Sequence, residues 1–430
     1  MPCKYKLTGS LEEAYNTPIK FFQRQSMDRP YAKVKITPKG EKKLRGGHPW
    51  VFDAEVTELS GDIENGDIVD VYSAKDRWLG AGFYNANSKI RVRLVSRNAN
   101  DRFDESFWRR ALAYAVDYRR TVMGEEDFKC CRLVFGEADR FPGLTVDRFG
   151  GVLVTETLSL GIERIKDMLF PALVAILRER GVEITAVYER NDAALRLKEG
   201  MAQGKGFFLG SGDGHVEICE NGIFYDVDYI NGQKTGFFLD QKYNRMAIRK
   251  IAAGRRVLDC FTHTGAFGFN AVAGGAEHVT SVDISADAIA QTKKNAARNG
   301  FTDKMDFVCA DVFDLLTDMA NRGGRPDYDF IILDPPAFTK SGATVKSACR
   351  GYKEINLKAM KLLPRGGYLA TCSCSHFMTD ELFRQMLAEA AADAEVSLRQ
   401  IEARQQGADH PILWGVPETE YLKFYVFQVV

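Results

Sequence analysis

The sequence predicts an α/β protein in which a doubly wound parallel sheet follows a small β-rich domain and a central α+β domain. From about residue 219, strand-like apolar runs such as "RRVLDCF" and "YDFIILDPP" alternate with helical stretches such as "SADAIAQTKKNAARNG". Regular alternation of this kind requires crossover helices between parallel strands. Before residue 100 the pattern differs, because short alternating runs are separated by Gly, Asn and Asp. These shorter runs indicate a separate β domain.

The chain is long enough for about two to four domains, since it has 430 residues. The central unit begins with the predicted helix "DESFWRRALAYAVDYRR" and contains a second amphipathic helix, "RIKDMLFPALVAILRERG", despite its internal Pro171. At the other end of the chain, "SLRQIEARQQ" and "EYLKFYVFQVV" are expected to form two strands as a hairpin at one edge of the parallel sheet. The predicted segments are an N-terminal extension of unassigned function at 1–30, the β domain at 31–98, the α+β domain at 102–218 and the parallel-sheet domain at 219–430.

Composition excludes several classes of protein. With 58 Lys and Arg against 58 Asp and Glu, the formal net charge is zero, so any nucleic-acid contact must depend on local basic patches. The nine cysteines follow no regular framework, and the first residues do not resemble a signal peptide. No apolar run reaches about 18 residues, the length needed to span a membrane. We therefore expect a cytoplasmic protein with reduced thiols and no membrane partner.

Two stretches of the β domain are basic. In "KIRVRLVSR", Ile90, Val92 and Leu94 alternate with cationic residues, so a strand here is expected to have one apolar and one cationic face. The stretch "KVKITPKGEKKLRGGHPW" places lysines close to an aromatic side chain, a combination that suits a nucleic-acid backbone with a stacked base. A solvated strand face is the alternative, because the next stretch is acidic. The candidate nucleic-acid-binding residues are Lys35, Lys39, Lys43, Arg45, Trp50, Arg91 and Arg93.

Four acidic residues, Asp259, Asp283, Asp311 and Asp334, follow four successive predicted strands. Ligands of open α/β sheets bind beyond the carboxyl ends of the strands, where an acid after the second strand accepts hydrogen bonds from ribose hydroxyls. The turn after the first strand lacks the G-x-G-x-x-G triplet of dinucleotide sites. Its carboxylate would repel a pyrophosphate but suits a cationic amino-acid group. These features together indicate S-adenosyl-L-methionine, although helix capping or turn formation also explains Asp259 or Asp283 taken alone.

The motifs "VLDCFTHTGAFG", "VDIS", "CADVFDLL", "ILDPPAF" and "TCSCSHFMT" resemble those of class I S-adenosylmethionine-dependent methyltransferases. With "NGQKTGFFLDQKYNR" and "RLVFGEADRFPGLTVDRFG", the chain is similar over residues 31–430 to the bacterial large-subunit (23S) ribosomal RNA cytosine-5 methyltransferases. The resemblance implies an RNA-binding PUA domain, a central α+β domain, a Rossmann-like methyltransferase domain, and large-subunit ribosomal RNA as substrate. The cofactor-binding residues that it implies are Asp259, Phe261, Thr262, Gly265, Asp283, Asp311 and Asp334.

The chain departs from the family pattern in its first thirty residues and in its pair of cysteines, Cys372 and Cys374. Cytosine C5 is a poor nucleophile, so its methylation needs a thiolate that adds to C6. The resemblance implies this role for Cys374, which matches the family's "SCS" pattern, whereas Cys372 matches the "TCS" of related enzymes. Residues two apart share one face of a strand, so the sequence leaves both open. Asp334 is expected to bind the cytosine N3 and N4 edge, and Phe338 either stacks on the base or is a core aromatic.

The sequence is also compatible with two other functions. The same acid-Pro-Pro-aromatic turn positions an exocyclic amino group of guanine or adenine in RNA methyltransferases that need no cysteine. A non-catalytic RNA-binding factor that retains the cofactor site is a third reading. Metal binding by "CSCSH" is disfavoured, because zinc needs four ligands and no second closely spaced pair of C-x-x-C type is present. The sequence leaves open whether the protein is a monomer or a homodimer.

Overall fold

The computed structural model describes residues 29–322, 327–339 and 341–430. The chain divides into two units, Met1–Tyr31 and Ala32–Val430, and every helix and strand below belongs to the second. Residues 1–28 of the predicted N-terminal extension lie outside the described residues. Within the described part of the chain, no helix is both long and apolar enough to cross a membrane.

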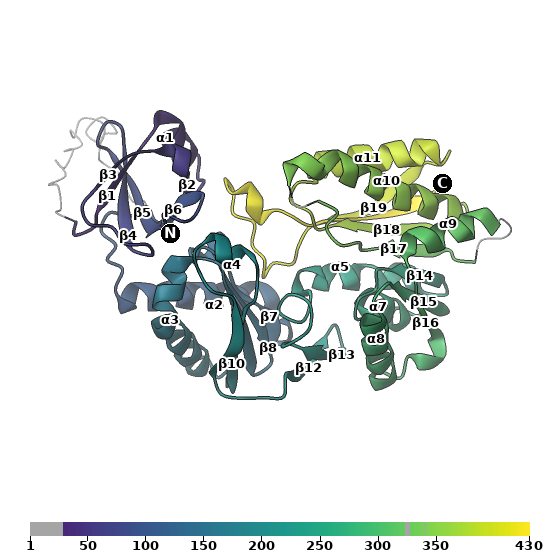
Figure 1. The fold of residues 1–430 in the computed structure, drawn as a ribbon. Helices are drawn as coiled ribbons and strands as arrows, with labels where there is room; N and C mark the ends of the chain where they lie inside the picture. Colours follow the sequence, from purple (N-terminus) through teal and green to yellow (C-terminus); the bar gives the residue numbers. More distant parts are fainter. Residues whose placement is uncertain (1–28, 323–326, 340) are drawn as a thin grey trace, which may run out of the picture. The chain divides into compact units, whose positions relative to one another are not determined.

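The first sheet has six strands in the order β2-β6-β5-β4-β1-β3, with β1 and β4 parallel and the other neighbours antiparallel (Figure 1). Its core contains Val34, Val51, Val71 and Val92, each fully buried. Helix α1 (Pro38–Arg45) begins after Thr37, whose hydroxyl accepts a hydrogen bond from the Gly40 amide. The strands are β1 (Lys33–Ile36), β2 (Trp50–Phe52), β3 (Val56–Ser60), β4 (Ile68–Ser73), β5 (Trp78–Tyr84) and β6 (Ile90–Ser96).

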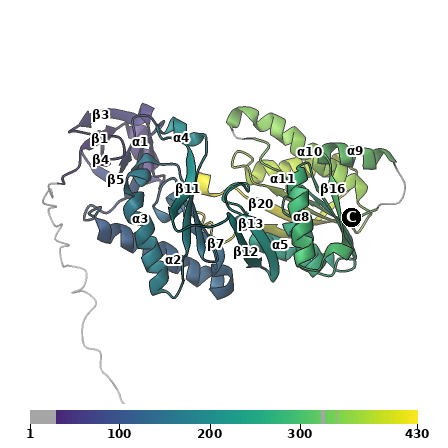
Figure 2. The same ribbon diagram turned by 60° about the horizontal axis from the view of Figure 1, so that its bottom comes forward.

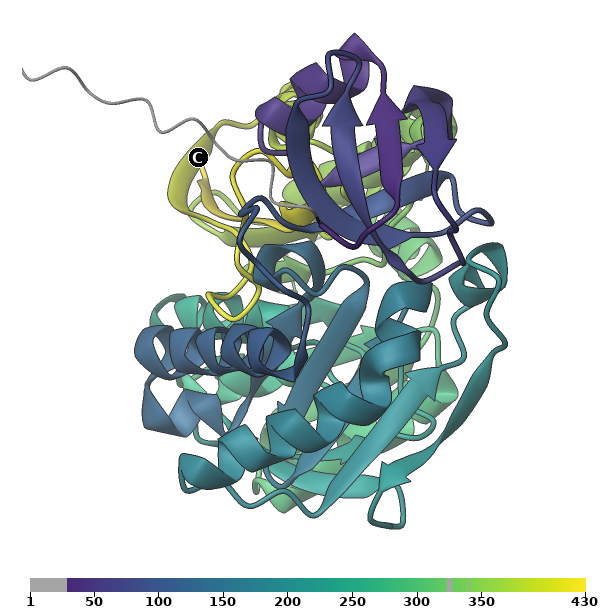
Figure 3. The same cartoon turned by 90° about the vertical axis from the view of Figure 1, so that its left-hand side faces the viewer.

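The second sheet has five strands in the order β11-β10-β9-β8-β7, and two long helices pack against it (Figure 3). Helix α2 (Glu105–Phe128) begins at the Asp104 cap, and Gly124 interrupts its helical backbone with a φ of 72°. Helix α3 (Leu160–Glu179) matches the predicted amphipathic helix and contains Pro171. The remaining elements are β7 (Cys130–Phe135), β8 (Leu144–Phe149), β9 (Val152–Thr157), β10 (Ala186–Asn191), α4 (Leu195–Lys198) and β11 (Gly204–Leu209).

The hairpin of β12 (His215–Glu220) and β13 (Ile223–Asp228) leads into the short helices α5 (Lys242–Ala247) and α6 (Arg249–Ala252). It lies beside helix α8 (Ala286–Arg298), as Figure 2 shows, and the Asp226 amide donates to Asn295 across this contact. Arg245 of α5 forms a buried two-pronged ion pair with Glu220 of β12, at 2.7 and 2.8 Å. This ion pair fixes α5 to the hairpin, because both side chains are almost fully buried.

The third sheet has seven strands in the order β16-β15-β14-β17-β18-β20-β19, of which the first five are parallel and the last two antiparallel. Figure 1 shows α7 and α8 on one side of it and α10 and α11 on the other. The structure therefore confirms the predicted doubly wound α/β fold. Its elements are β14 (Arg256–Cys260), α7 (Ala266–Ala273), β15 (His278–Asp283), β16 (Met305–Cys309), α9 (Val312–Arg322), β17 (Phe330–Leu333), α10 (Val345–Leu362), β18 (Tyr368–Ser373), α11 (Asp380–Asp393), β19 (Leu398–Arg404) and β20 (Lys423–Val429).

The two final strands pair at one edge of the sheet as expected, but residues 405–422 connect them instead of a tight turn. This connection reaches the second sheet, where the Arg132 amide donates to the Asp409 carboxylate at 2.9 Å. Arg119 of α2 donates to the Asp409 carbonyl at 2.8 Å. His48 lies 3.2 Å from the Glu418 carboxylate, so the same connection also contacts the first sheet. The connection between β19 and β20 thus contacts both preceding domains as well as its own sheet.

We expect Glu220→Gln to lower the free energy of unfolding by about 3–5 kcal/mol, because it leaves the Arg245 charge buried without a counter-ion. Urea unfolding followed by circular dichroism measures this change. Glu217→Gln is the matched control, since Glu217 lies on the same strand but is exposed. Its ion pair with Arg298 is expected to contribute about 0–1 kcal/mol. Equal losses in the two variants would contradict the structural role of the buried pair.

Candidate active site

The four acids predicted at strand ends all lie at the carboxyl edge of the parallel strands. Asp259 is the fourth residue of β14 and Asp283 is the last residue of β15. Asp311 follows β16 by two residues, and Asp334 directly follows β17. Because β14, β15, β16 and β17 are parallel neighbours, the fold brings these side chains to one edge of the sheet. Ligand sites of doubly wound sheets lie at this edge.

The turn after β14 wraps its backbone around the Asp259 carboxylate. Oδ2 of this fully buried side chain accepts hydrogen bonds from the Thr262 hydroxyl and from the Gly268 amide, the latter at 2.9 Å. A Cβ at Gly268 would lie 2.9 Å from Asp259 Oδ2, so only glycine fits this contact. Phe261 and His263 adopt left-handed φ values of 61° and 51°, which shows that the turn is strained.

The other oxygen of Asp259, Oδ1, is buried and has no hydrogen-bond partner. Burial of such a carboxylate oxygen costs free energy unless a hydrogen-bond donor contacts it. Burial raises the pKa of Asp259 to about 7, and the nearby Asp334 and Asp283 charges act in the same direction. The residues therefore fit a cationic group such as the ammonium of S-adenosylmethionine, as the sequence suggests.

Asp283 and Asp311 order the backbone around the same edge. The Asp283 carboxylate accepts hydrogen bonds from the amides of His263 and Ser285, both at 2.9 Å. Asp311 accepts from the Phe313 amide at 2.7 Å and so starts helix α9. A carboxylate oxygen has more than one acceptor site, so Asp283 keeps the capacity to bind ribose hydroxyls. Asp311 thus caps a helix, and the cofactor-binding roles of Asp283 and Asp311 stay predictions.

Asp334 is half-buried, and the Gln241 amide donates to its Oδ1 at 3.0 Å. Burial raises the pKa of Asp334 to about 7, and the Asp240 charge adds to the shift. A carboxyl group with this pKa is partly protonated at neutral pH and is able to donate a hydrogen bond. The turn after β17 therefore presents a group that can act as a hydrogen-bond donor or acceptor near pH 7.

The two cysteines of the "TCSCS" run differ in exposure. Cys372 lies inside β18 and is fully buried, and its thiol contacts the Asp334 and Gln241 side chains. Cys374 follows the end of β18 at Ser373, is partly exposed, and its Sγ donates a weak hydrogen bond to the Pro335 carbonyl at 4.0 Å. The expectation that a strand keeps both on one face does not decide access, because the strand ends between them. Burial and the Asp334 charge raise the pKa of both thiols, that of Cys374 to about 12.

Lys423 of β20 is a buried cation close to the Cys374 segment. Its ammonium donates to the carbonyls of Ser375 at 2.6 Å and Tyr421 at 2.7 Å. Burial lowers the pKa of Lys423 to about 8, whereas a charge on Cys374 would raise it. The Ser375 hydroxyl in turn donates to the Thr339 carbonyl at 2.9 Å, which ties the cysteine segment to the loop after Asp334.

Sequence reasoning did not identify Gln241 or Lys423 as site residues. Gln241 lies in the quoted stretch "NGQKTGFFLDQKYNR", so the resemblance contained a signal for it. Lys423 lies in the final strand and gave no signal, because only the antiparallel pairing of Ser373 with Lys423 brings it to the cysteines. Phe338 packs on Tyr352, with ring centroids 4.5 Å apart, and contacts the third-sheet core. Of the two roles that the sequence left open for Phe338, its side chain therefore has that of a core aromatic.

The predicted nucleic-acid-binding residues of α1 and its neighbours are mostly ion-paired. Lys35 lies 3.0 Å from Asp76 and 3.2 Å from Glu58, and this raises the pKa of Lys35. The Lys43 ammonium lies 2.6 Å from Glu55, and Arg45 lies 2.9 Å from Glu41. Lys39 is exposed. Two of these acids, Glu55 and Glu58, come from the acidic stretch that follows the patch in the sequence.

The solvent-facing cationic face expected on β6 is not present at Arg93, which is almost fully buried. Its guanidinium contacts Glu199 at 2.9 Å and Glu137 at 3.5 Å, both from the second domain along the chain. The Trp50 indole also donates to Glu137, at 2.8 Å, and Arg91 donates to the Asn85 carbonyl. Arg93 and Trp50 therefore hold the first sheet to the central region, and their role in RNA binding stays a prediction.

Metal ligands are not gathered anywhere in residues 29–322, 327–339 and 341–430, where no group of three or more His, Cys, Asp or Glu could hold an ion. The site as described consists of acids, a glycine turn and a partly exposed thiol. These groups suit binding of a nucleoside with a cationic tail and a reaction on a second molecule beside it.

Comparison with known proteins assigns the fold and the cofactor. Residues 34–97 match the model of a PUA-like domain, and residues 198–423 match that of the S-adenosylmethionine-dependent methyltransferases. A solved S-adenosylmethionine-dependent methyltransferase from Streptococcus mutans has the same fold, with a TM-score of 0.78 at 23% identity over 92% of this chain and 100% of that chain. The predicted cofactor, S-adenosyl-L-methionine, is confirmed by the family match.

Full-length relatives give a narrower assignment. The protein of Klebsiella pneumoniae (strain 342) named ribosomal RNA large subunit methyltransferase I is 37% identical over 94% of this chain and 100% of its own length. Its namesake from Aliivibrio fischeri (strain MJ11) is 39% identical over 91% and 97%. Fold and site thus define a class I S-adenosylmethionine-dependent methyltransferase. The chain belongs to the family of the proteins named ribosomal RNA large subunit methyltransferase I.

We expect Asp259→Asn to gain stability relative to the wild-type protein as pH rises. The folded protein holds the Asp259 proton up to about pH 7, whereas the unfolded chain releases it near the ordinary value of 3.8. Between these values, wild-type stability therefore falls with rising pH, and asparagine cannot ionise. The gain from pH 5 to pH 8 should be about 2.5–3 kcal/mol, because about two pH units separate pH 5 from the folded pKa of about 7 and each contributes about 1.4 kcal/mol.

Urea unfolding midpoints of the cofactor-free protein at pH 5, 6, 7 and 8 measure this gain. Asp303→Asn is the control, because Asp303 is exposed and lies outside the site. If the two variants differ from wild type by amounts that do not change with pH, Asp259 is already ionised in the folded protein at pH 5.

Proposed function

We propose that the protein methylates carbon 5 of a cytidine in large-subunit ribosomal RNA through a covalent adduct between Cys374 and C6. The exposure of Cys374 beside the Asp334 turn is the observation that carries this proposal. Methylation of an amino group needs no thiol, since nitrogen already offers a lone pair. A partly exposed cysteine beside the turn after Asp334 is therefore a feature that cytosine-5 chemistry uses and amino-group methylation does not.

The residues take the following roles in the proposal. Asp334, with a pKa of about 7, donates a proton or hydrogen bond to cytosine N3 and so makes C6 electrophilic. The Cys374 thiol releases its proton to solvent and its sulfur adds to C6, which leaves C5 with the electron density to attack a methyl group. S-adenosyl-L-methionine supplies that methyl group when bound. Transfer of the C5 proton to water then restores the ring and expels Cys374 as a thiolate, and a proton accepted at N3 returns to Asp334.

Cofactor binding by the acids is part of the same proposal. The buried and unpartnered Oδ1 of Asp259 supports a role in binding the cofactor ammonium. A Cβ at Gly265 would lie 2.4 Å from Phe269, and one at Gly268 would lie 2.8 Å from Ser281, so the two glycines allow the turn to pack closely around the Asp259 carboxylate. Asp283 is assigned to the ribose and Asp311 to the adenine. Phe261 and Thr262 complete the turn, in which the Thr262 hydroxyl already contacts Asp259.

Ribosomal RNA is proposed as the substrate on two grounds. The relatives with full-length similarity carry names that specify large-subunit ribosomal RNA, and residues 34–97 match a PUA-like domain. We propose the division into an RNA-binding domain at 31–98, a central domain at 102–218 and a methyltransferase domain at 219–430. An extruded base at Cys374 would then be presented by RNA held on the first two domains.

Trapping with 5-fluorocytidine tests the chemistry. We expect ribosomal RNA that contains 5-fluorocytidine to form a covalent adduct with the protein in the presence of S-adenosylmethionine, because fluorine at C5 blocks the final elimination. Denaturing gel electrophoresis detects the adduct as a shifted band. Cys374→Ala should remove the adduct and lower methyl transfer to unmodified RNA by at least about 10³-fold, since the covalent step is lost.

Cys372→Ala is the matched control and should keep the adduct. If Cys372→Ala removes the adduct and Cys374→Ala does not, the reaction is retained and the nucleophile is wrong. If no adduct forms on RNA that accepts methyl groups in its unmodified form, methylation of a guanine or adenine amino group becomes the better assignment. If no RNA accepts methyl groups, the non-catalytic RNA-binding reading gains support.

Lys423→Met should slow the alkylation of Cys374 by iodoacetamide at pH 7.5 by about 3–10-fold, because removal of a neighbouring cation lowers the thiolate fraction. The Lys423 charge lowers the pKa of Cys374, whereas burial and the Asp334 and Asp240 charges raise it. Lys423 itself titrates near pH 8, so the difference between the variants should shrink as pH rises above that value.

Mass spectrometry of the Cys374 peptide gives the alkylation rate. Lys423→Arg keeps the charge and is expected to preserve most of the rate. Equal rates for wild type and Lys423→Met at pH 7.5 would show that Lys423 only holds the Ser375 and Tyr421 carbonyls.

A further inference from the structure

We propose that a pocket of the central domain binds a backbone phosphate of the RNA substrate through Arg148 and Arg120. The pocket is called here the Arg148 pocket, and it has a cavity volume of about 230 Å³. The identity of its ligand rests on the function proposed above. Its main walls are formed by Arg120, Gly124, Phe128, Arg148, Arg180 and Val182.

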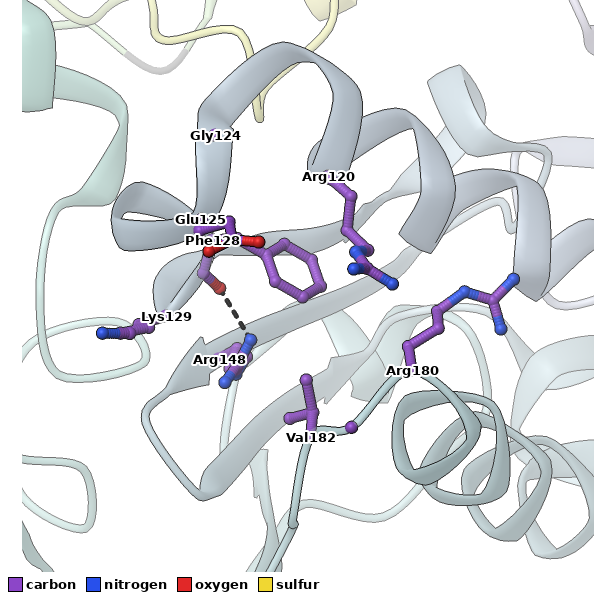
Figure 4. Close-up of a pocket in the computed structure, with 9 residues that line it drawn as sticks. Arg120, Gly124, Glu125, Phe128, Lys129, Arg148, Arg180 and Val182 are labelled. Carbon is purple, nitrogen blue, oxygen red and sulfur yellow. Dashed lines mark hydrogen bonds between the residues drawn. The ribbon is translucent and has the colours of Figure 1, made fainter.

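The pocket exists because two chain segments turn sharply beside the end of β8. Helix α2 loses its helical backbone at Gly124, where φ is 72°, and the chain after α3 turns at Gly181, where φ is 77°. A Cβ at either glycine would meet nothing within 4 Å, so both turns border open space. Figure 4 shows the Arg120 and Arg148 side chains approaching this space from different elements, with the Phe128 ring between them.

Arg148 carries a buried charge that no acidic residue neutralises within residues 29–322, 327–339 and 341–430. It is only 7% exposed, and its guanidinium lies 4.8 Å from the centre of the Phe128 ring. Nε donates to the Gly150 carbonyl and Nη1 to the Phe128 carbonyl, both at 2.9 Å, while Nη2 donates to no acceptor in the described part of the chain. Burial lowers the pKa of Arg148. Because buried charges are ordinarily paired, this cation favours an anion from outside the chain.

Arg120 provides a second cation that is free to bind a ligand. It is exposed, and it forms no ion pair with any acidic residue that the structure describes. The carboxylate closest in sequence, Asp117, already takes a two-pronged ion pair from Arg180 at 2.5 and 2.7 Å. The Arg180 charge is therefore neutralised, and the Arg180 side chain lines the pocket without offering a free charge to a ligand.

The two other charged residues at the pocket do not change this balance. Lys129 is paired with Glu126 at 2.7 Å and points away from the other labelled side chains in Figure 4. Glu125 is exposed and is the acidic side chain among the lining residues. Two available guanidinium groups against one exposed carboxylate leave the pocket attractive to an anion.

The size and chemistry of the pocket favour a phosphate that belongs to a longer chain. Guanidinium groups match the geometry of phosphate oxygens and are the preferred protein partners of nucleic-acid backbones. A cavity of about 230 Å³ is smaller than the roughly 300–1,000 Å³ of typical small-molecule sites. It therefore suits one phosphate of a strand that passes over the surface better than a whole nucleotide.

The pocket wall is connected to the active site by a short segment. Lys242 donates to the Asp127 and Cys130 carbonyls at 3.1 and 2.7 Å, on either side of the pocket residue Phe128. The preceding residue, Gln241, donates to Asp334. RNA bound at Arg148 would thus be held in a defined position relative to the catalytic acid.

Salt-dependent RNA binding tests the proposal with Arg120→Gln, Arg148→Lys and the control Arg178→Gln. Arg178 is an exposed residue near the end of α3 that does not line the pocket. The assay measures the anisotropy of a labelled large-subunit RNA fragment over a range of salt concentrations. Loss of one phosphate contact should reduce the slope of log K against log salt by about 0.7–0.9 and weaken binding by about 3–10-fold. Methyl transfer at saturating RNA should be unchanged.

Unchanged slopes and affinities in Arg120→Gln and Arg148→Lys, with a wild-type protein that binds and methylates the RNA, would overturn this proposal alone. A wild-type protein that neither binds nor methylates ribosomal RNA would overturn the proposed function as well. Calorimetry with inorganic phosphate distinguishes free phosphate from an RNA phosphate as the ligand. If Arg120→Gln abolishes the heat of phosphate binding but leaves RNA affinity unchanged, the pocket binds free phosphate and the RNA proposal is wrong. Arg120 is exposed, so its substitution tests the pocket even if Arg148→Lys folds poorly.

Discussion

The buried ion pair between Arg245 and Glu220 fixes the short segment on which the active site depends. Arg245 also donates to the Phe238 carbonyl and stacks over the Phe237 ring, so its guanidinium is held on several sides. The preceding residues of the same segment contact two regions, since Gln241 donates to Asp334 and Lys242 donates to the Asp127 carbonyl near the end of α2. One buried ion pair therefore holds the segment that contacts both Asp334 and the central domain.

Burial of carboxyl groups is the second constraint on the site. Asp259 and Asp334 lie at neighbouring strand ends. Removal from water raises the pKa of each to about 7, and nearby carboxylates add to the shift, Asp334 and Asp283 at Asp259 and Asp240 at Asp334. A carboxylate at Asp259 favours the arrival of a cation, whereas a protonated Asp334 is able to donate to a base. The same electrostatic environment raises the pKa of the Cys374 thiol, which explains why a cation such as Lys423 matters beside it.

Much of the fold could be predicted because its signals are local. The alternation of strands and helices, and acids such as Asp283 that end strands, are visible within a few residues of sequence. The partners of charged side chains could not be predicted, because they come from distant segments. Glu199 and Glu137 remove Arg93 from the solvent, and Asp409 reaches α2 and β7 from the connection between the last two strands. Gln241 is tied to Asp334 across 93 residues of chain.

The sequence by itself determined the class of fold, the cofactor and the acids at the strand ends, because each depends on local patterns and on motifs that keep their order along the chain. Only the tertiary structure decided which cysteine is accessible. Strand periodicity places Cys372 and Cys374 on one face, but β18 ends at Ser373, so the Cys372 thiol is fully buried and the Cys374 thiol is partly exposed. Likewise, the availability of a cation depends on which acids folding brings to it. Folding supplies acids to Lys43 and Arg93 and, among the described residues, none to Arg148.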